Sequence, residues 1–193
     1  MSSGFSTFTF DTHNILDGSL RSVPDQSVAY SIRTEETGPG SSRERRRTIL
    51  QLQGGAGAPA CIDWKQKTFE ISGVTRNISE VRTSRGRFKF SPSHHWSWFD
   101  CEEYKLKYGA EVEHSWTVYS YSGETLATFT SNVRHLHNKK ALPVLSICPS
   151  IRDEEERRFI ILVLLYSETK RHQKELRRSL GGMGDFFGNL GGD

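Results

Sequence analysis

The stretch from Phe159 to Tyr166, Phe-Ile-Ile-Leu-Val-Leu-Leu-Tyr, places eight apolar residues in succession near the end of the chain. A helix of this composition has no polar face, so the rest of the protein must enclose it on every side. Acidic residues precede it at 153–156, and the pair Ser150/Asp153 resembles a capping box. Basic residues that complement a helix dipole follow it: Lys170, Arg171, Lys174, Arg177 and Arg178. We therefore expect a buried core helix over about 150–178, with a buried strand as the competing interpretation.

The rest of the chain, from Thr7 to Cys148, alternates apolar and polar residues with a period of two, as half-buried strands do. The segments with this alternation are Phe8/Phe10, Val28–Arg33, Leu50/Leu52, Ile62/Trp64, Phe69/Ile71, Ile78–Val81, Phe88/Phe90, Trp96/Trp98, Tyr104–Tyr108, Trp116–Tyr119, Leu126–Phe129 and Val144–Ile147. Turn residues separate them, and no helical period lies between them, which argues against a nucleotide-binding parallel sheet. A curled sheet is the simplest enclosure for an apolar helix. The prediction is a mainly β fold, a closed antiparallel barrel of about twelve strands around the buried C-terminal helix.

Length and composition fit one domain. A chain of 193 residues with 35% hydrophobic content can bury a core without disulfide bonds. We expect a single domain over 1–180 and a flexible, glycine-rich tail over 181–193. The net charge of +3 is too small to predict nucleic-acid binding. An apolar run of eight residues is also too short for a transmembrane helix, which takes about 20.

The cysteines indicate a compartment. Cys61, Cys101 and Cys148 are odd in number and lie mostly in strand-like runs, as small buried apolar residues do in a reducing environment. The first ten residues lack the basic start and apolar run of a secretory signal. The expected location is cytoplasmic, with access to membrane surfaces. Asn77-Ile78-Ser79 fits a glycosylation acceptor, which we interpret as a chance match without such a signal.

Two basic clusters are the candidate ligand-binding residues. The first is Arg43, Arg45, Arg46 and Arg47, and the second is Arg82, Arg85, Arg87 and Lys89. A phosphorylated head group needs several such donors converging from adjacent loops, and arginine offers bidentate geometry. The alternative is that both clusters are solvated charges that protect strand edges from pairing.

Histidines and aromatic residues offer two further sites. His94, His95, Cys101, His135 and His137 are weak candidates for zinc or copper, because no short ligand motif supports them. We therefore expect no metal and no cofactor. Trp96, Trp98, Phe99 and Tyr104 could stack on a sugar or enter a membrane interface, but packing in the core is the favoured interpretation.

Motifs for catalysis are missing from the sequence. There is no Gly-x-Ser-x-Gly elbow, no P-loop and no dinucleotide fingerprint. Adjacent acids such as Glu102 and Glu103 would point to opposite faces of a strand. The balance leans away from an enzyme, although an active site assembled at one barrel mouth stays open as an alternative.

About twelve short strands followed by one wholly apolar helix resemble the tubby C-terminal-like superfamily, which includes the tubby proteins, LURP-one-related plant proteins and phospholipid scramblases. The segments that carry the resemblance are Trp116–Tyr119, the turn Ser122-Gly123-Glu124 and Phe159–Tyr166. More narrowly, the chain is similar to an uncharacterised fungal domain family thought to share this barrel. The tubby phosphoinositide-binding motif has no counterpart at particular positions here, so no functional residues are carried over.

The resemblance implies a non-catalytic intracellular module that recognises anionic membrane lipid head groups of the phosphoinositide type. A protein-interaction or structural module, which would use exposed strand edges or the Phe186-Phe187 tail, is the second hypothesis. An enzyme is the third.

Overall fold

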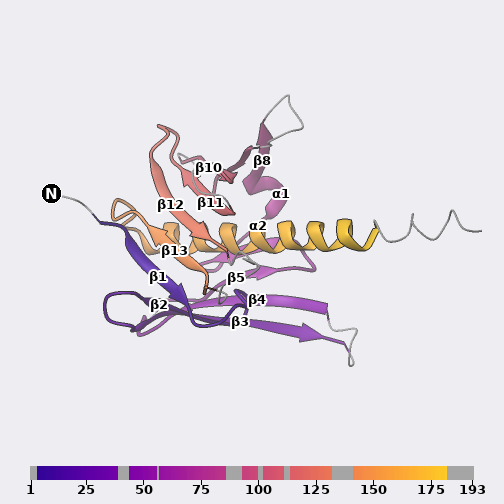
Figure 1. Cartoon of the computed structure of the whole chain (residues 1–193), viewed down its shortest axis with the longest axis horizontal. Coiled ribbons are helices and arrows are strands. Elements are labelled where there is room, and N and C mark those ends of the chain that lie inside the picture. Colours follow the sequence, from indigo (N-terminus) through magenta and orange to yellow (C-terminus); the bar gives the residue numbers. More distant parts are fainter. Residues whose placement is uncertain are drawn as a thin grey trace, which may run out of the picture.

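The computed structural model describes residues 4–38, 44–55, 57–85, 93–99, 102–110, 114–131 and 141–181. Figure 1 shows strands arranged around one long helix. The strands are β1 (Ser6–Phe10), β2 (Gly18–Ser22), β3 (Val28–Thr37), β4 (Glu44–Leu52), β5 (Ala60–Asp63), β6 (Thr68–Ile71), β7 (Val74–Asn77), β8 (Arg82–Arg85), β9 (Ser93–Trp96), β10 (Tyr104–Tyr108), β11 (Ser115–Tyr119), β12 (Thr125–Thr130) and β13 (Val144–Ile147). The helices are α1 (Ile78–Val81) and α2 (Glu154–Gly181).

The strands form one antiparallel sheet of 13 strands in the order β7-β6-β5-β4-β3-β2-β1-β13-β12-β11-β10-β9-β8. The mainly β class and the C-terminal helix are thus as predicted. The closed barrel of twelve strands is wrong, because β7 and β8 do not pair and the sheet stays open between them.

The short helix α1 accounts for the opening. The Glu80 carboxylate accepts hydrogen bonds from the backbone N–H of Asn77, at 3.2 Å, and from its side-chain amide, at 2.8 Å. This contact starts a helical turn whose Ile78 and Val81 are buried in the core. A helical turn presents no ladder of hydrogen-bonding groups, so it cannot join the two edges. The predicted strand at Ile78–Val81 is therefore wrong.

The helix α2 lies inside the curl of the sheet, and Figure 1 shows it running between the two halves of the sheet. Each residue from Phe159 to Leu165 is at most 3% exposed. The Phe159 ring packs against Phe69 of β6 and Tyr104 of β10, with centroids 6.3 and 5.8 Å away. Side chains from both halves of the sheet thus enclose the helix. The buried helix is confirmed, and the competing strand is excluded.

The start of α2 lies slightly later than predicted. The Asp153 carboxylate, and not Ser150, receives the first free N–H groups, at 3.4 Å from the nitrogens of Glu155 and Glu156. The Ser150 hydroxyl instead donates to Cys148 Sγ at 3.1 Å. Acidic residues of the first turn then fix the helix to the sheet, because the hydroxyl of Tyr30 donates to Glu154 at 2.9 Å.

Three further strands were not predicted from the sequence, namely β2, β7 and β8. The predicted strand Phe88/Phe90 and the tail at 182–193 lie outside the described residues. Among the helices of the described chain, none has an apolar stretch long enough to cross a membrane.

Candidate functional site

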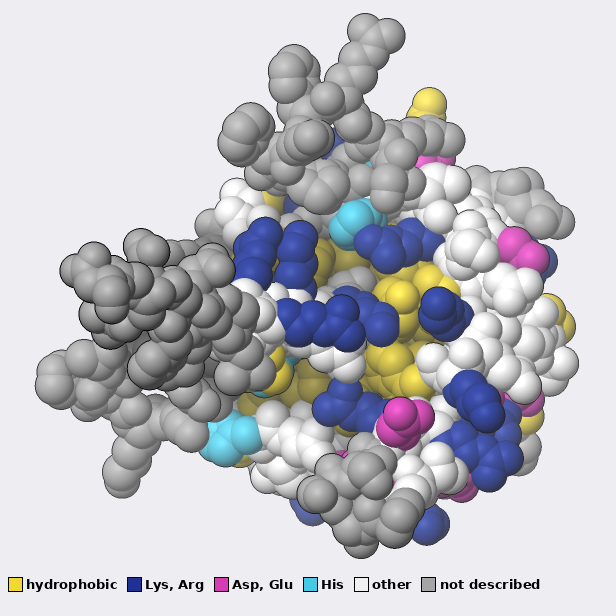
Figure 2. All heavy atoms as spheres, turned by 90° about the vertical axis from the view of Figure 1, so that its right-hand side faces the viewer, with side chains coloured by type: hydrophobic (Ala, Val, Ile, Leu, Met, Phe, Trp, Pro, Cys, Tyr) yellow, Lys and Arg dark blue, Asp and Glu magenta, His cyan; other side chains and the backbone are white. Residues whose placement is uncertain are grey.

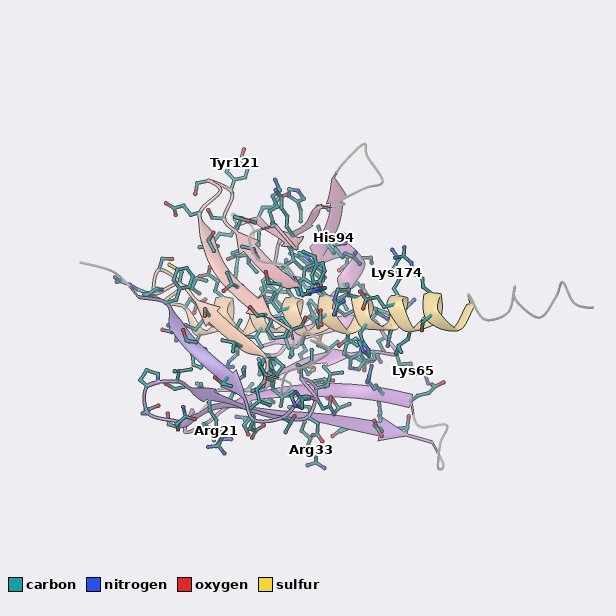
Figure 3. All side chains as sticks on the ribbon, in the orientation of Figure 1. Arg21, Arg33, Lys65, His94, Tyr121 and Lys174 are labelled. Atoms are coloured by element: carbon teal, nitrogen blue, oxygen red, sulfur yellow. The ribbon has the colours of Figure 1, made fainter. Side chains whose placement is uncertain are left out.

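The face of the molecule from which α2 leaves the sheet carries the clearest concentration of charge. Figure 2 shows Lys and Arg side chains gathered there around exposed apolar surface. Lys65, His94 and Lys174 lie at this end in Figure 3, whereas Arg21 and Arg33 point away from it. We define the basic rim as six cations from four segments of the chain: Arg45, Lys67, Arg82, Lys170, Lys174 and Arg177.

The charges of four rim residues act on Lys170. Burial lowers the pKa of Lys170, and the charges of Lys67, Arg177, Arg45 and Arg82 lower it further. Within the described part of the chain, no rim cation forms an ion pair with a carboxylate. Like charges held together without counter-charges disfavour one another, and an anion that binds between them removes that cost.

An aromatic pair lies under Lys170. The rings of Trp64 and Tyr166 stack with centroids 5.7 Å apart, and Lys170 Nζ lies 5.9 and 5.6 Å from their centroids. The ammonium group is attracted to both ring faces. Its position near the middle of the rim is therefore fixed by packing as well as by charge.

A β-bulge separates the predicted arginines of the first cluster. The pairing of β3 with β4 shifts between Glu35 and Glu36, so these consecutive residues face Arg47 and Arg45. Such a shift re-aims side chains. Arg45 joins the basic rim, whereas the guanidinium of Arg47 pairs with Glu70 and donates to Cys61 Sγ at 3.1 Å. Arg46 is exposed, and Arg43 lies outside the described residues.

The second cluster contributes Arg82 to the rim. Its guanidinium lies 3.0 Å from His94 Nε2 and 5.6 Å from the centroid of the Trp96 ring. Burial lowers the pKa of His94 to about 4, helped by the charge of Arg82, so this imidazole is neutral near pH 7. Arg85 belongs to β8, while Arg87 and Lys89 lie outside the described residues. Among the cluster members whose side chains the structure describes, Arg45 and Arg82 lie on one face.

The other rim residues were missed as ligand-binding candidates. Lys170, Lys174 and Arg177 follow the apolar run at helical spacing, which we interpreted only as complementing the dipole. Lys67 ends the turn between β5 and β6 in a left-handed backbone conformation, with φ 58°. The Asp63 carboxylate holds that turn by accepting from the N–H groups of Lys65 and Gln66 at 3.0 and 2.7 Å.

Two hollows lie on either side of α2 within this face. The first, which we call the turn pocket, has a volume of about 440 Å³ and is lined by Gln66, Lys67, Asn77, Ile78, Ser79, Arg82 and Tyr166. It combines two cations with the neutral polar groups of Asn77, Ser79 and Gln66. This composition suits a phosphate group, which takes both charge and hydrogen bonds.

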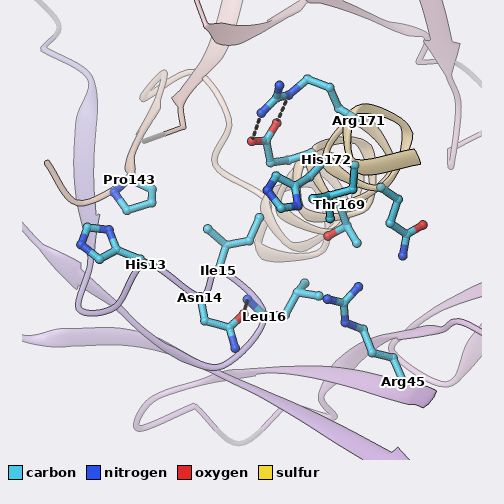
Figure 4. A pocket seen from close by; sticks show the side chains of 12 residues that line it. His13, Asn14, Ile15, Leu16, Arg45, Pro143, Thr169, Arg171 and His172 are labelled. Carbon is cyan, nitrogen blue, oxygen red and sulfur yellow. Dashed lines mark hydrogen bonds and ion pairs between the residues drawn. The ribbon is translucent and has the colours of Figure 1, made fainter. Parts of the chain in front are cut away.

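The second hollow, the loop–helix cleft, also measures about 440 Å³. Figure 4 shows it between the loop that joins β1 to β2 and the C-terminal half of α2. Its lining residues are His13, Asn14, Ile15, Leu16, Arg45, Pro143, Glu168, Thr169, Arg171, His172, Gln173 and Leu176. Its lining includes both charged and apolar side chains.

A chain of hydrogen bonds links the two sides of this face. The indole N–H of Trp64 donates to the Thr48 hydroxyl at 2.8 Å, and the Thr34 hydroxyl donates to the Leu16 carbonyl at 2.6 Å. The two threonine oxygens are 2.8 Å apart, so Thr48 donates to Thr34 and every proton has one acceptor. These hydrogen bonds fix the loop of the loop–helix cleft to β3 and β4.

Replacing Thr48, which is fully buried, tests this series of hydrogen bonds. We expect Thr48→Val to lower the free energy of unfolding by about 1–3 kcal/mol, because the buried indole N–H of Trp64 loses its acceptor. Denaturant unfolding measures the effect. The matched control is Thr75→Val on an exposed position of β7, which should stay within about 0.5 kcal/mol of the parent. Equal stabilities of the two variants would contradict the role of the chain.

The histidine and aromatic hypotheses can be compared with the structure. His95 forms an ion pair with Glu103, with Nδ1 and Oε1 2.5 Å apart, and Cys101, His135 and His137 lie outside the described residues. Within the described ranges, no three His, Cys, Asp or Glu side chains group as a metal site would require. Trp96, Trp98 and Tyr104 are at most 4% exposed, which agrees with packing in the core.

Comparisons with protein-family models, with curated proteins and with solved structures found no match to this chain. The features of the molecule that bear on its function are therefore the geometry and charge of the basic rim and the two hollows.

Proposed function

We propose that the chain is a non-catalytic binding module that docks on anionic lipid head groups at a membrane surface through the basic rim. The observation that carries the proposal is the convergence of cations from β4, the β5–β6 turn, β8 and α2 around the end of one buried helix, none of which pairs with a carboxylate among the described residues. The phosphates of a head group would occupy the rim and the turn pocket. The resemblance to the tubby C-terminal-like superfamily supports the same ligand class.

The charge of the rim suits a membrane better than a neutral surface. A basic side chain close to an anionic leaflet gains about 1 kcal/mol, and the gain falls off within a Debye length. Several cations that face the same way therefore add their attractions. The sheet that surrounds α2 keeps these cations in place, since each is attached to a strand, a tight turn or the core helix.

Co-sedimentation with vesicles that contain a few per cent of a phosphoinositide tests the proposal. We expect the parent to bind at physiological salt, and the double variant Lys67→Glu/Lys174→Glu to bind at least about 30-fold more weakly, because two attractions become repulsions. Both side chains are exposed, so the variant should keep the parent's melting temperature.

The matched control is Arg21→Glu/Arg152→Glu, which changes the net charge by the same amount. Arg21 points away from the rim in Figure 3, and Arg152 is exposed just before the opposite end of α2. This control should weaken binding by less than about threefold, because charges more than a Debye length away are screened. Equal losses in the two double variants would indicate attraction by net charge alone. Absence of binding by the parent to any anionic vesicle would refute the proposal.

A protein-interaction module remains the second candidate, and the open sheet is the observation that favours it. The edge strands β7 and β8 each have a neighbour on one side only, and Val74 of β7 is 50% exposed. An extended segment of another chain could pair with such an edge. Binding of that kind would survive the charge reversal at Lys67 and Lys174.

A further inference from the structure

We infer that the loop–helix cleft is a separate ligand site for a small amphipathic anion, a short apolar chain that ends in one carboxylate or phosphate. The inference goes beyond docking on membranes, because it concerns a single soluble molecule and the opposite side of α2 from the turn pocket.

Among the described residues that line the cleft, the one carboxylate is already neutralised. Glu168 accepts hydrogen bonds from Nε and Nη2 of Arg171, both at 2.7 Å, and from the indole N–H of Trp116 at 2.9 Å. Figure 4 shows Arg171 on one wall, with dashed lines to the carboxylate that it binds. Because these two charges satisfy each other, neither is available to a ligand of either sign.

Arg45 supplies the remaining full charge. Its side chain reaches from β4 toward Leu16 in Figure 4, and it forms no ion pair within the described part of the chain. Neutral donors accompany it, namely the amides of Asn14 and Gln173. A cation with amide donors and no free acid selects an anionic group.

The lining of the cleft is partly apolar. It includes Ile15 and Leu16 of the loop, Pro143, and Leu176 of α2, and Leu176 is 49% exposed despite its apolar side chain. The apolar chain of a ligand bound there would cover the side chain of Leu176 and would itself be removed from water. The volume of about 440 Å³ lies in the lower part of the range for small-molecule sites, so it suits one short chain and not a two-chain lipid.

The loop that forms one wall is fixed before any ligand arrives. The carbonyl of Leu16 is held by Thr34, and the N–H of Leu16 donates to the Asn14 side chain at 3.2 Å. The Asp11 carboxylate accepts from the N–H of Ser19 at 2.7 Å at the end of the loop. A prearranged wall lowers the entropic cost of binding.

NMR titration of the ¹⁵N-labelled protein with monomeric octanoate, octyl phosphate and octylammonium tests the inference. We expect the two anions to give saturable shifts at Ile15, Leu16 and His172 below about 10 mM, and octylammonium to give none. Butanoate should bind more weakly than octanoate, by about threefold for each CH₂ that no longer enters the cleft. The relative affinities of octanoate and octyl phosphate decide which head group the site prefers.

Variants separate this site from the turn pocket. Arg45→Gln should weaken octanoate binding about tenfold or more, and Leu176→Asn about fivefold, while Lys67→Glu should leave it unchanged. The inference is overturned if neither anion saturates, if octylammonium binds equally, or if Lys67→Glu has the same effect as Arg45→Gln. If the protein bound vesicles but not octanoate, the ligand site in the cleft would be refuted and the proposed function would stand. If it bound octanoate but not vesicles, the proposed function would be refuted and the ligand site would stand.

Discussion

Leu164→Asp is expected to abolish cooperative folding. Leu164 is 2% exposed near the middle of α2, where strands from both halves of the sheet surround the helix. A carboxylate there would lose its hydration without gaining a partner, at a cost of several kcal/mol. Since domains of this size are stable by only about 5–15 kcal/mol, the variant should lack a thermal unfolding transition and be degraded rapidly by protease.

A graded pair of substitutions makes the same test quantitative. Leu164→Ala should lower the free energy of unfolding by about 2–5 kcal/mol, as cavity-forming substitutions do in a core. The matched control is Leu176→Ala on the same helix, which should cost less than about 1 kcal/mol because that side chain is 49% exposed. If Leu164→Asp stayed soluble and melted cooperatively at the parent's temperature, α2 could not be enclosed by the sheet.

The enclosed helix was predictable because the information is local. Any helix formed by Phe159–Tyr166 is apolar all round, whichever strands surround it. The strands with strict alternation, such as Tyr104–Tyr108, were predictable for the same reason, and Tyr104 and Leu106 are indeed buried. Strands such as β7, whose residues are mostly exposed, have no such pattern.

The opening of the sheet depends on a sequence motif that has two possible interpretations. Asn77-Ile78-Ser79-Glu80 contains both a glycosylation pattern and a capping box, and only the second explains the helical turn between β7 and β8. With Glu80 three residues after Asn77, the sequence did hold the information. The predicted strand at Ile78–Val81 overlooked it, although the spacing of three between these two apolar residues is typical of a helical turn.

The candidate site was less predictable than the fold, because it depends on contacts between distant segments. Arg45 and Arg82 are 37 positions apart in the sequence, yet both act on Lys170. The bulge that places Arg45 apart from Arg47 follows from the pairing of β3 with β4, which no local pattern specifies. Charge clusters in the sequence therefore identified candidates but could not select among them.

Arg171→Met is the second substitution with a large expected effect. Arg171 binds Glu168 through two hydrogen bonds, and the side chain of Glu168 is 9% exposed. Without Arg171 a buried carboxylate is left with the indole of Trp116 as its one strong donor. Removing one partner of a buried pair costs about 3–5 kcal/mol, so we expect a loss near 3 kcal/mol at pH 7, measured by denaturant unfolding. The control Arg177→Met, at an exposed position of the same helix, should change stability by less than about 0.5 kcal/mol.

The pH dependence of that loss identifies its cause. Burial by itself would raise the pKa of Glu168, but the hydrogen bonds from Arg171 and Trp116 outweigh it and leave the pKa below the ordinary 4.5. A lowered pKa in the folded state contributes stability above pH 4.5 that is lost as the pH falls through the lowered value. In Arg171→Met the hydrogen bonds from Arg171 no longer oppose the effect of burial on the pKa of Glu168. Glu168 therefore takes up a proton at a higher pH than in the parent, and the cost of burying a charged carboxylate then disappears.

The difference between the parent and Arg171→Met should therefore be largest at neutral pH and shrink below about pH 4.5. Adding Glu168→Gln to Arg171→Met removes the buried charge and should restore much of the stability at pH 7, because a neutral amide can still accept from Trp116. A loss that is independent of pH, or a double variant no more stable than Arg171→Met, would mean that Arg171 acts by packing on Tyr108, whose ring centroid lies 4.8 Å from its guanidinium carbon. With the pH dependence as stated, the neutral wall of the loop–helix cleft and the anchoring of α2 to β11 would depend on the same ion pair.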